Sequence, residues 1–135
     1  MIDKILAIDY GSKFTGFALS DETGTLATAL PPLIQTNTQK QQIFISQLVK
    51  RHEINHILLG LPTGLAQKPT QISKQVEKFG EEVARLTGLP VKYWNETGTS
   101  KQAEQSFNRK KALQSHSEAA RIMLQEFLDF QRTGI

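Results

Sequence analysis

Three short apolar segments lie between turns in the first 30 residues, and this pattern constrains the fold more than any other feature of the chain. Residues 6–8 are apolar and lead into a turn at 9–12, residues 14–19 follow, and a third segment at 25–30 stops at Pro31-Pro32. Short apolar segments bounded by turn residues are typical of β-strands. The chain is therefore expected to open as an antiparallel meander of three strands.

After the meander, helical and strand patterns alternate. Periodic apolar residues predict helices at about 38–52, 72–86, 100–107 and 115–131, and strands at 54–59 and 90–94. Thr38 and Gln41 fit a capping box, and Gly88 fits the end of the second helix. This order predicts an α/β fold, a five-stranded mixed sheet with helices on both faces. The strands at 6–8, 54–59 and 90–94 are expected to be parallel and central.

Length and composition exclude several classes of protein. The chain has 135 residues, so we expect a single domain over 1–135. Because it contains no cysteine, it has no disulfide scaffold, thiol nucleophile or cysteine-based metal site. No apolar run approaches the roughly 20 residues of a membrane span, and the N-terminus does not resemble a signal peptide. We expect a soluble cytoplasmic protein.

The positive charge is concentrated in one stretch. The formal net charge of the chain is +3, and residues 97–117 carry the same net charge through Lys101, Arg109, Lys110 and Lys111 against Glu104. We expect the triplet at 109–111 to lie in a loop before the last helix. This basic loop either contacts nucleic acid phosphates or is an ordinary solvated surface.

Asp9 and Glu96 are the candidate catalytic pair. Each follows a strand that is expected to be parallel, and the carboxyl ends of parallel strands meet at one edge of a sheet. Two carboxylates at one point could hold Mg²⁺ or Mn²⁺ ions for phosphodiester hydrolysis. Alternatively, both acids are ordinary loop residues or helix caps.

The turn from Asp9 to Lys13 is the second candidate element of a site. Gly11 and Gly16 permit close approach of the backbone, and Lys13 could meet a phosphate together with backbone N–H groups. The alternative is a hairpin turn in which glycine supplies a positive φ.

Four segments together resemble one known family. The run Asp9-Tyr10-Gly11-Ser12-Lys13-Phe14-Thr15-Gly16-Phe17-Ala18-Leu19-Ser20-Asp21 is similar to the opening signature of the YqgF family of Holliday-junction-resolvase-like proteins. Gly60-Leu61-Pro62, Asn95-Glu96 with the residues after it, and Ser117-x-Ala119-Ala120 resemble that family's later motifs. These matches occur in the family's order over nearly the whole chain.

The resemblance implies a ribonuclease H-like fold and a metal-dependent nuclease that acts on structured nucleic acid. The implied substrate is the ribosomal RNA precursor, at the 5′ end of pre-16S rRNA in ribosome biogenesis, or Holliday-junction-like DNA. It implies a site for two Mg²⁺ or Mn²⁺ ions with Asp9 and Glu96 as catalytic metal ligands. Phosphates would be met by Lys13, Arg109, Lys110 and Lys111.

The chain departs from the family pattern at three positions of the site. His116 stands where the family has a third acid, and Asn95 and Thr97 stand where it has Asp and Arg. His116 is either a replacement ligand, which weakens the site for Mg²⁺ and suits Mn²⁺ better, or an ordinary residue of the helix. Replacing a carboxylate by a neutral group removes negative charge, so the affinity for metal should fall.

The other candidate residues have structural interpretations. Ser115 and Glu118 fit a capping box at the start of the last helix, which makes Glu118 a poor substitute for the missing acid. His52 and His56 are expected to be structural. One of Tyr93 and Trp94 is expected to pack in the core.

Two further functions stay open at this point. The chain could be a nucleic-acid- or ribosome-binding module of the same fold whose catalytic site has decayed. It could also be a nucleotide-binding fragment of the actin-like or sugar-kinase class, although such proteins close two lobes around the nucleotide.

Overall fold

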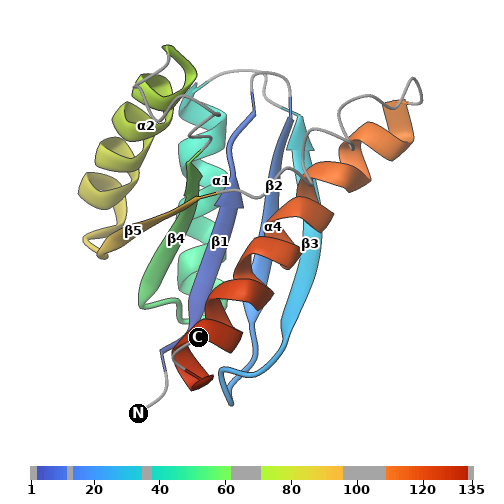
Figure 1. The fold of residues 1–135 in the computed structure, drawn as a ribbon. Coiled ribbons are helices and arrows are strands. Elements are labelled where there is room, and N and C mark those ends of the chain that lie inside the picture. Colours follow the sequence, from blue (N-terminus) through green and yellow to red (C-terminus); the bar gives the residue numbers. More distant parts are fainter. Residues whose placement is uncertain (1–2, 12–13, 35–37, 62–70, 96–108, 134–135) are drawn as a thin grey trace.

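The computed structural model describes residues 3–11, 14–34, 38–61, 71–95 and 109–133. Strands and helices alternate along these ranges (Figure 1). In chain order they are β1 (Ile5–Asp9), β2 (Phe14–Ser20), β3 (Ala27–Ile34), α1 (Thr38–Arg51), β4 (His56–Leu61), α2 (Gln71–Thr87), β5 (Val91–Asn95) and α4 (Arg109–Thr133). The helix predicted at 100–107 lies outside the described residues.

The five strands form one mixed sheet in the order β3-β2-β1-β4-β5. β1 pairs antiparallel with β2 and parallel with β4, and β4 pairs parallel with β5. The opening meander, the parallel strands and the five-stranded sheet are thus confirmed. The expectation that all three parallel strands are central is wrong for β5, which forms one edge of the described sheet because the last described element is a helix.

Helices cover both faces of the sheet, as predicted. Ile5 and Ala7 of β1 pack in a core with the apolar face of α4, whereas Leu6 and Ile8 pack in a second core with α1 and α2. Figure 1 shows α4 crossing in front of the sheet. Since side chains alternate along a strand, odd-numbered positions of β1 face α4 and even-numbered positions face α1 and α2.

Small side chains line the face of the sheet under α4. Ala7, Ala18 and Ala27 are buried there against Ala120 and the larger residues of the helix. The sheet backbone is therefore within reach of polar side chains on α4. Gln125 uses this proximity, since its Oε1 accepts a hydrogen bond from the Ala27 N–H at 3.0 Å and its Nε2 donates to the Thr25 carbonyl at 2.7 Å.

The first helix differs from the prediction in the role of one residue. Gln41 is 1 % exposed, and its Nε2 donates a hydrogen bond to Oγ1 of buried Thr15 at 3.0 Å. The side chain of Thr38 lies outside the described residues, so the capping box is not tested. Gln41 instead joins α1 to the beginning of β2.

The end of α2 agrees with the sequence. Gly88 has φ +70°, a conformation that side-chain-bearing residues rarely adopt, and its N–H donates to the Ala84 carbonyl at 2.8 Å. Glycine therefore ends this helix and directs the chain into β5.

The third strand runs further than the sequence predicted. β3 does not stop at Pro31-Pro32 but continues to Ile34. It lies at an edge of the described sheet, where a missing N–H is tolerated. The pairing with β2 also shifts between Thr15 and Phe17, so that the two prolines lie opposite Gly16 alone. This β-bulge accommodates both prolines in the strand.

The last helix begins six residues earlier than predicted. α4 starts at Arg109 rather than near Ser115, so the expected basic loop at 109–111 is the first turn of a helix. The prediction followed the periodic apolar residues, which begin at Ala120. Residues 109–116 belong to the same helix, but their apolar residues Ala112 and Leu113 are adjacent and show no helical spacing.

Within the described ranges, no helix combines the length and the apolar character that crossing a lipid bilayer requires.

The bond between Gln41 and Thr15 predicts a coupled loss of stability. Gln41→Leu leaves the Thr15 hydroxyl without this donor, and Thr15→Val leaves the Gln41 amide without this acceptor. Each change should lower the free energy of unfolding by about 1–3 kcal/mol, while the double variant should lose less than the sum of the two. Urea unfolding of the four proteins measures this cycle.

Gln47→Leu is the control for that experiment, since Gln47 is exposed on the same helix. It should change stability by no more than about 0.5 kcal/mol. Strictly additive losses in the Gln41 and Thr15 variants would contradict a direct interaction.

Candidate functional site

Asp9 is a buried carboxylate at the end of the central strand. It is the last residue of β1 and is only 4 % exposed. Ile5 and Ala7 belong to the core under α4, so alternation along β1 directs the Asp9 side chain to the same face. The sequence predicted Asp9 just after a parallel strand; in the structure Asp9 is the last residue of that strand, and its side chain is nearly inaccessible to solvent.

The residue after Asp9 anchors the chain on the opposite face. The Tyr10 ring stacks on Phe79 of α2 with the ring centroids 4.4 Å apart. A large aromatic contact of this kind fixes the backbone on which it sits. Tyr10 therefore holds the end of β1 against α2, while Asp9 faces α4.

Gly16 faces Asp9 without a side chain. It is the direct partner of Asp9 in the antiparallel pair, where opposing Cβ atoms stand about 4.5–5.5 Å apart. Ala18, two residues further along β2, packs under α4, so a side chain at position 16 would stand on that same face. Because glycine has none, Asp9 has no side chain opposite it on that face.

A serine of α4 contacts the strand beside Gly16. Ser117 is buried, and its Oγ accepts a long hydrogen bond of 3.4 Å from the Phe17 N–H. Phe17 directly follows Gly16, the partner of Asp9. The backbone of residue 116 therefore lies next to a residue that contacts β2 near Asp9, whereas the side chain of His116 lies outside the described residues.

The ends of the parallel strands meet at this edge of the sheet. Leu61 is the last residue of β4 and pairs with Asn95, the last residue of β5. Because β1, β4 and β5 are parallel, both residues end at the same edge as Asp9. Glu96 directly follows Asn95 but lies outside the described residues, as does Lys13.

The predicted metal ligands are therefore only partly visible. Among the side chains that the structure describes, no three of the types His, Cys, Asp and Glu cluster to hold a metal ion. Asp9 is among the described side chains, whereas Glu96 and the side chain of His116 are not. The ligand set remains a prediction.

The basic triplet begins a helix instead of forming a loop. Arg109, Lys110 and Lys111 are the first residues of α4, and its first turn contains no acidic residue. A helix N-terminus carries a partial positive charge and free N–H groups. Three cations at that end are unfavourable for the stability of the helix itself. Together with the partial positive charge, they create an end of α4 that favours the binding of anions.

Glu118 has a structural role other than the predicted one. Ser115 lies inside α4, so Ser115 and Glu118 do not form an N-terminal capping box. The exposed Glu118 carboxylate instead accepts hydrogen bonds from Arg121 Nε at 3.0 Å, and these bonds lower the pKa of Glu118. The carboxylate is committed to this ion pair, which supports its exclusion as a site acid.

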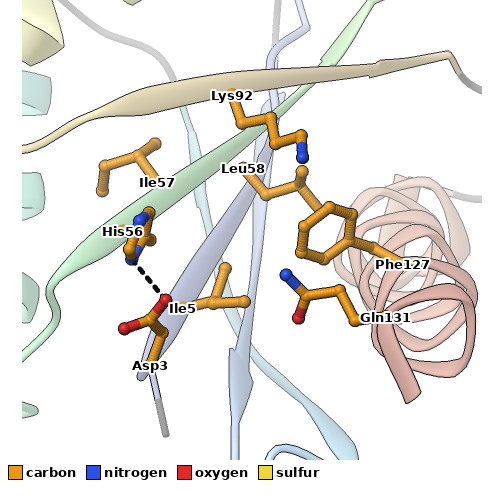
Figure 2. A pocket seen from close by; sticks show the side chains of 8 residues that line it. All are labelled: Asp3, Ile5, His56, Ile57, Leu58, Lys92, Phe127 and Gln131. Atoms are coloured by element: carbon orange, nitrogen blue, oxygen red, sulfur yellow. Dashed lines mark ion pairs between the residues drawn. The ribbon is translucent and has the colours of Figure 1, made fainter. Parts of the chain in front are cut away.

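His56 lies at the other end of the sheet, beside a small cavity (Figure 2). Its Nδ1 is 3.2 Å from Oδ2 of Asp3, within ion-pair distance although the geometry does not meet hydrogen-bond criteria. The cavity of about 80 Å³ is lined by Asp3, Ile5, His56, Ile57, Leu58, Lys92, Phe127 and Gln131. Pockets for small molecules measure about 300–1,000 Å³, so this one is too small for a metabolite. His52 directly follows α1. For both histidines, the interpretation as structural residues is kept.

Both aromatic residues of β5 pack against helices, one on each face. The Trp94 ring contacts Phe127 of α4 with centroids 5.2 Å apart, and the Tyr93 hydroxyl donates to the Glu77 carbonyl of α2 at 3.3 Å. Burial raises the pKa of Tyr93. The prediction that one of these two aromatic residues packs in the core is thus confirmed, and in fact both pack there.

Sequence reasoning missed three buried polar residues at this end of the sheet, of which Thr15 and Gln41 lie on the face opposite to Asp9. Thr15, Gln41 and Ser117 are buried and joined to their neighbours by hydrogen bonds. Ser117 precedes Ala120 at a helical spacing of three, and this small-residue pattern is the one signal of close packing. No comparable pattern marks Thr15 or Gln41.

Comparison with known proteins gives a match over almost the full chain. Residues 3–130 match the family model described as "RuvX: Holliday junction resolvase". A relative from Synechocystis, named "Putative pre-16S rRNA nuclease", is 33% identical over 136 residues, which cover 96% of this chain and 90% of the relative.

Two solved structures have a similar fold. Thermus thermophilus RuvC in complex with a Holliday junction substrate aligns with a TM-score of 0.60 at 14% identity, covering 98% of this chain and 97% of that chain. The fowlpox virus Holliday junction resolvase aligns with a TM-score of 0.53 at 15% identity, covering 93% and 98%. At these identities the likeness concerns the fold, and it agrees with the predicted α/β class.

Proposed function

Because the chain belongs to the RuvX family of Holliday junction resolvases, we propose that it is a nuclease that hydrolyses phosphodiester bonds in structured nucleic acid. The substrate that we propose is the precursor of 16S ribosomal RNA, as in the name of the Synechocystis relative, which matches the chain over 96% of its length. Branched DNA is the second substrate to test. The match over residues 3–130 argues against the nucleotide-binding fragment considered from the sequence.

The observation that carries this proposal is the position of Asp9. Its carboxylate is buried at the end of β1, on the face that α4 covers, opposite a glycine. Carboxylate oxygens are hard ligands of the kind that Mg²⁺ and Mn²⁺ prefer. A carboxylate at the carboxyl end of a central strand is therefore suited to bind such an ion.

The residues at this edge fit Mg²⁺ or Mn²⁺ as the bound group. Asp9 and Glu96 offer hard oxygen ligands, and His116 offers an imidazole nitrogen in place of the third acid. Two such ions, when bound, supply an activated water and stabilise the charge on the phosphate oxygens. The imidazole favours Mn²⁺ over Mg²⁺, and this departure from the family pattern should weaken the site for Mg²⁺.

The chain's own residues would orient the substrate. Tyr10 holds the backbone of Asp9 against α2, so the carboxylate keeps one position during binding. The first turn of α4 presents Arg109, Lys110 and Lys111 together with its partial positive charge. We propose that this turn and Lys13 contact backbone phosphates, which requires no base recognition.

The alternative is a binding module of the same fold whose catalytic site has decayed. The neutral residue His116 at the position of an acid, with Asn95 and Thr97 beside Glu96, favours this alternative. Calorimetric titration with Mg²⁺ and Mn²⁺ separates the two functions, because a decayed site should bind neither ion tightly.

Asp9→Asn should abolish metal-dependent cleavage and preserve the fold. The amide has nearly the shape of the carboxylate but lacks its charge, so cleavage should fall at least about a hundredfold. The measurement is cleavage of precursor 16S rRNA and of a four-way DNA junction, each with Mg²⁺ and with Mn²⁺.

Asp3→Asn is the matched control, because Asp3 lies next to the other end of β1 and is exposed. It should cleave at the rate of the unchanged protein. Full activity in a pure Asp9→Asn sample would disprove the proposed site.

Replacing Arg109, Lys110 and Lys111 by alanine should weaken binding to all sequences equally. The slope of log affinity against log salt should fall by up to about 0.9 for each lost contact on duplex DNA, or 0.7 on single strands. The helix should not be destabilised, since removing cations from its N-terminus relieves an unfavourable interaction.

The control for this triple variant changes Lys50, Arg51 and Lys78 to alanine. These exposed residues lie on α1 and α2, away from α4, and their loss lowers the net charge equally. An unchanged salt slope in the first variant, or equal slopes in both, would mean that the basic turn is solvated surface.

His116→Asp should raise the affinity for Mg²⁺ by about tenfold or more, because it adds a charged oxygen ligand beside Asp9 and Glu96. Position 116 lies within α4 and not in its first turn. His and Asp have similar helix propensities, so the helix should persist. Calorimetry with Mg²⁺ and the rate of Mg²⁺-supported cleavage measure the effect.

His116→Asn is the matched control, since it has the size of Asp without the charge. It should leave the affinity for Mg²⁺ at or below that of the unchanged protein. Equal Mg²⁺ binding by the Asp and Asn variants would indicate that residue 116 lies away from the metal and would favour the decayed module.

A further inference from the structure

Buried polar side chains gather at one end of β1 and β2. The described part of the chain buries five polar or charged residues: Asp9, Thr15, Ser20, Gln41 and Ser117. All except Ser20 lie at the level of Gly16, with Asp9 and Ser117 on the face under α4 and Thr15 and Gln41 on the face under α1. Such clustering in an otherwise apolar core indicates that this end of the sheet is held in place by specific bonds.

Ser117 connects the last helix to this cluster. Its side chain is 3 % exposed, and its Oγ accepts the Phe17 N–H at 3.4 Å across one hundred residues of sequence. The contact is one residue along β2 from the level of Asp9. Along α4, Ser117 directly follows residue 116.

An irregularity in the sheet lies at the same level. The pairing between β2 and β3 shifts between Thr15 and Phe17, where Pro31 and Pro32 together face Gly16. Phe17 is the first residue after this shift, at the place where the regular ladder resumes. A bulge of this kind disturbs the local hydrogen bonds of a sheet. The Ser117 hydroxyl supplies an acceptor from outside the sheet at that point.

We propose that Ser117 is a positioning residue for the Asp9 site. Its hydroxyl fixes α4 against β2, and this sets where residue 116 stands relative to Asp9. The inference rests on the proposed nuclease function, because position 116 matters only if the site performs chemistry. Small displacements of catalytic geometry reduce rates strongly, so loss of the hydroxyl should affect turnover more than substrate binding.

The competing explanation is that Ser117 is a small residue at a close contact between helix and sheet. The chain contains a matched control for this alternative. Ser20 is 1 % exposed, and its Oγ accepts the Ile5 N–H at 2.8 Å at the opposite end of the same two strands. Ser20→Ala and Ser117→Ala each remove one buried hydroxyl that accepts a backbone N–H.

The experiment compares these two variants with the unchanged protein by two measurements. Hydrogen exchange followed by NMR reports on the Phe17 and Ile5 amides without metal or substrate. Steady-state cleavage of precursor 16S rRNA or junction DNA with Mn²⁺ gives kcat and KM.

We expect Ser117→Ala to speed exchange at Phe17 and to lower kcat about tenfold to a hundredfold with little change in KM. Ser20→Ala should speed exchange at Ile5 and leave kcat and KM unchanged.

Two results would overturn the positioning role of Ser117 and leave the proposed nuclease function standing. One is unchanged Phe17 exchange in Ser117→Ala, which would show that the hydrogen bond does not hold α4. The other is a kcat that falls equally in both serine variants, which would indicate a general loss of stability. If the unchanged protein does not cleave either substrate with metal, the proposed function fails, and the positioning role fails with it.

Discussion

The close approach of α4 to the sheet is the interaction on which the rest of the structure depends. Ala7, Ala18 and Ala27 present small side chains to this helix, whereas the opposite face carries large residues against α1 and α2. A helix packed on small residues comes near enough for its polar side chains to bond with the sheet backbone. Gln125 does so at β3, and Ser117 does so at β2. The same helix covers the face of the sheet on which Asp9 lies.

The two halves of the candidate site are supported in different ways. Asp9 belongs to a strand with neighbours on both sides and is followed by a tyrosine stacked on α2. Residue 116 depends on a helix that is attached to the sheet through side chains. The geometry of the site is therefore set by helix docking as much as by strand pairing, and helix docking responds to single side-chain changes.

Much of the fold could be predicted because it follows from periodic apolar patterns. The strands around Leu6, Leu19 and Leu58 and the apolar stripe of α2 are of this kind, and Gly88 marks the end of its helix. The predicted element boundaries were wrong where contacts with other elements override the local preference of the residues. Pro31-Pro32 remain in a strand because the edge and the bulge remove the need for their N–H groups. The first turn of α4 carries basic residues instead of the apolar stripe by which a helix is recognised in a sequence.

The candidate site was predictable only in part, for a similar reason. Asp9 follows an apolar strand, and this position alone indicates the carboxyl edge of a sheet. The other buried polar residues at this end of the sheet are a threonine, a glutamine and a serine, which the sequence presents as ordinary surface residues. Their burial depends on contacts between elements far apart in the chain, as the pairs Gln41–Thr15 and Phe17–Ser117 show.

The prolines of β3 also protect the molecule from self-association. An eight-residue edge strand with exposed Leu26 just before it and Ile34 at its end would offer a template on which another chain could add a strand. Proline is one of the residues by which edge strands avoid such pairing, and the bulge twists this strand away from a flat edge. The residues that shape the neighbourhood of Asp9 thus also act against aggregation through this edge, so replacing both prolines should make the protein less soluble even where its fold persists.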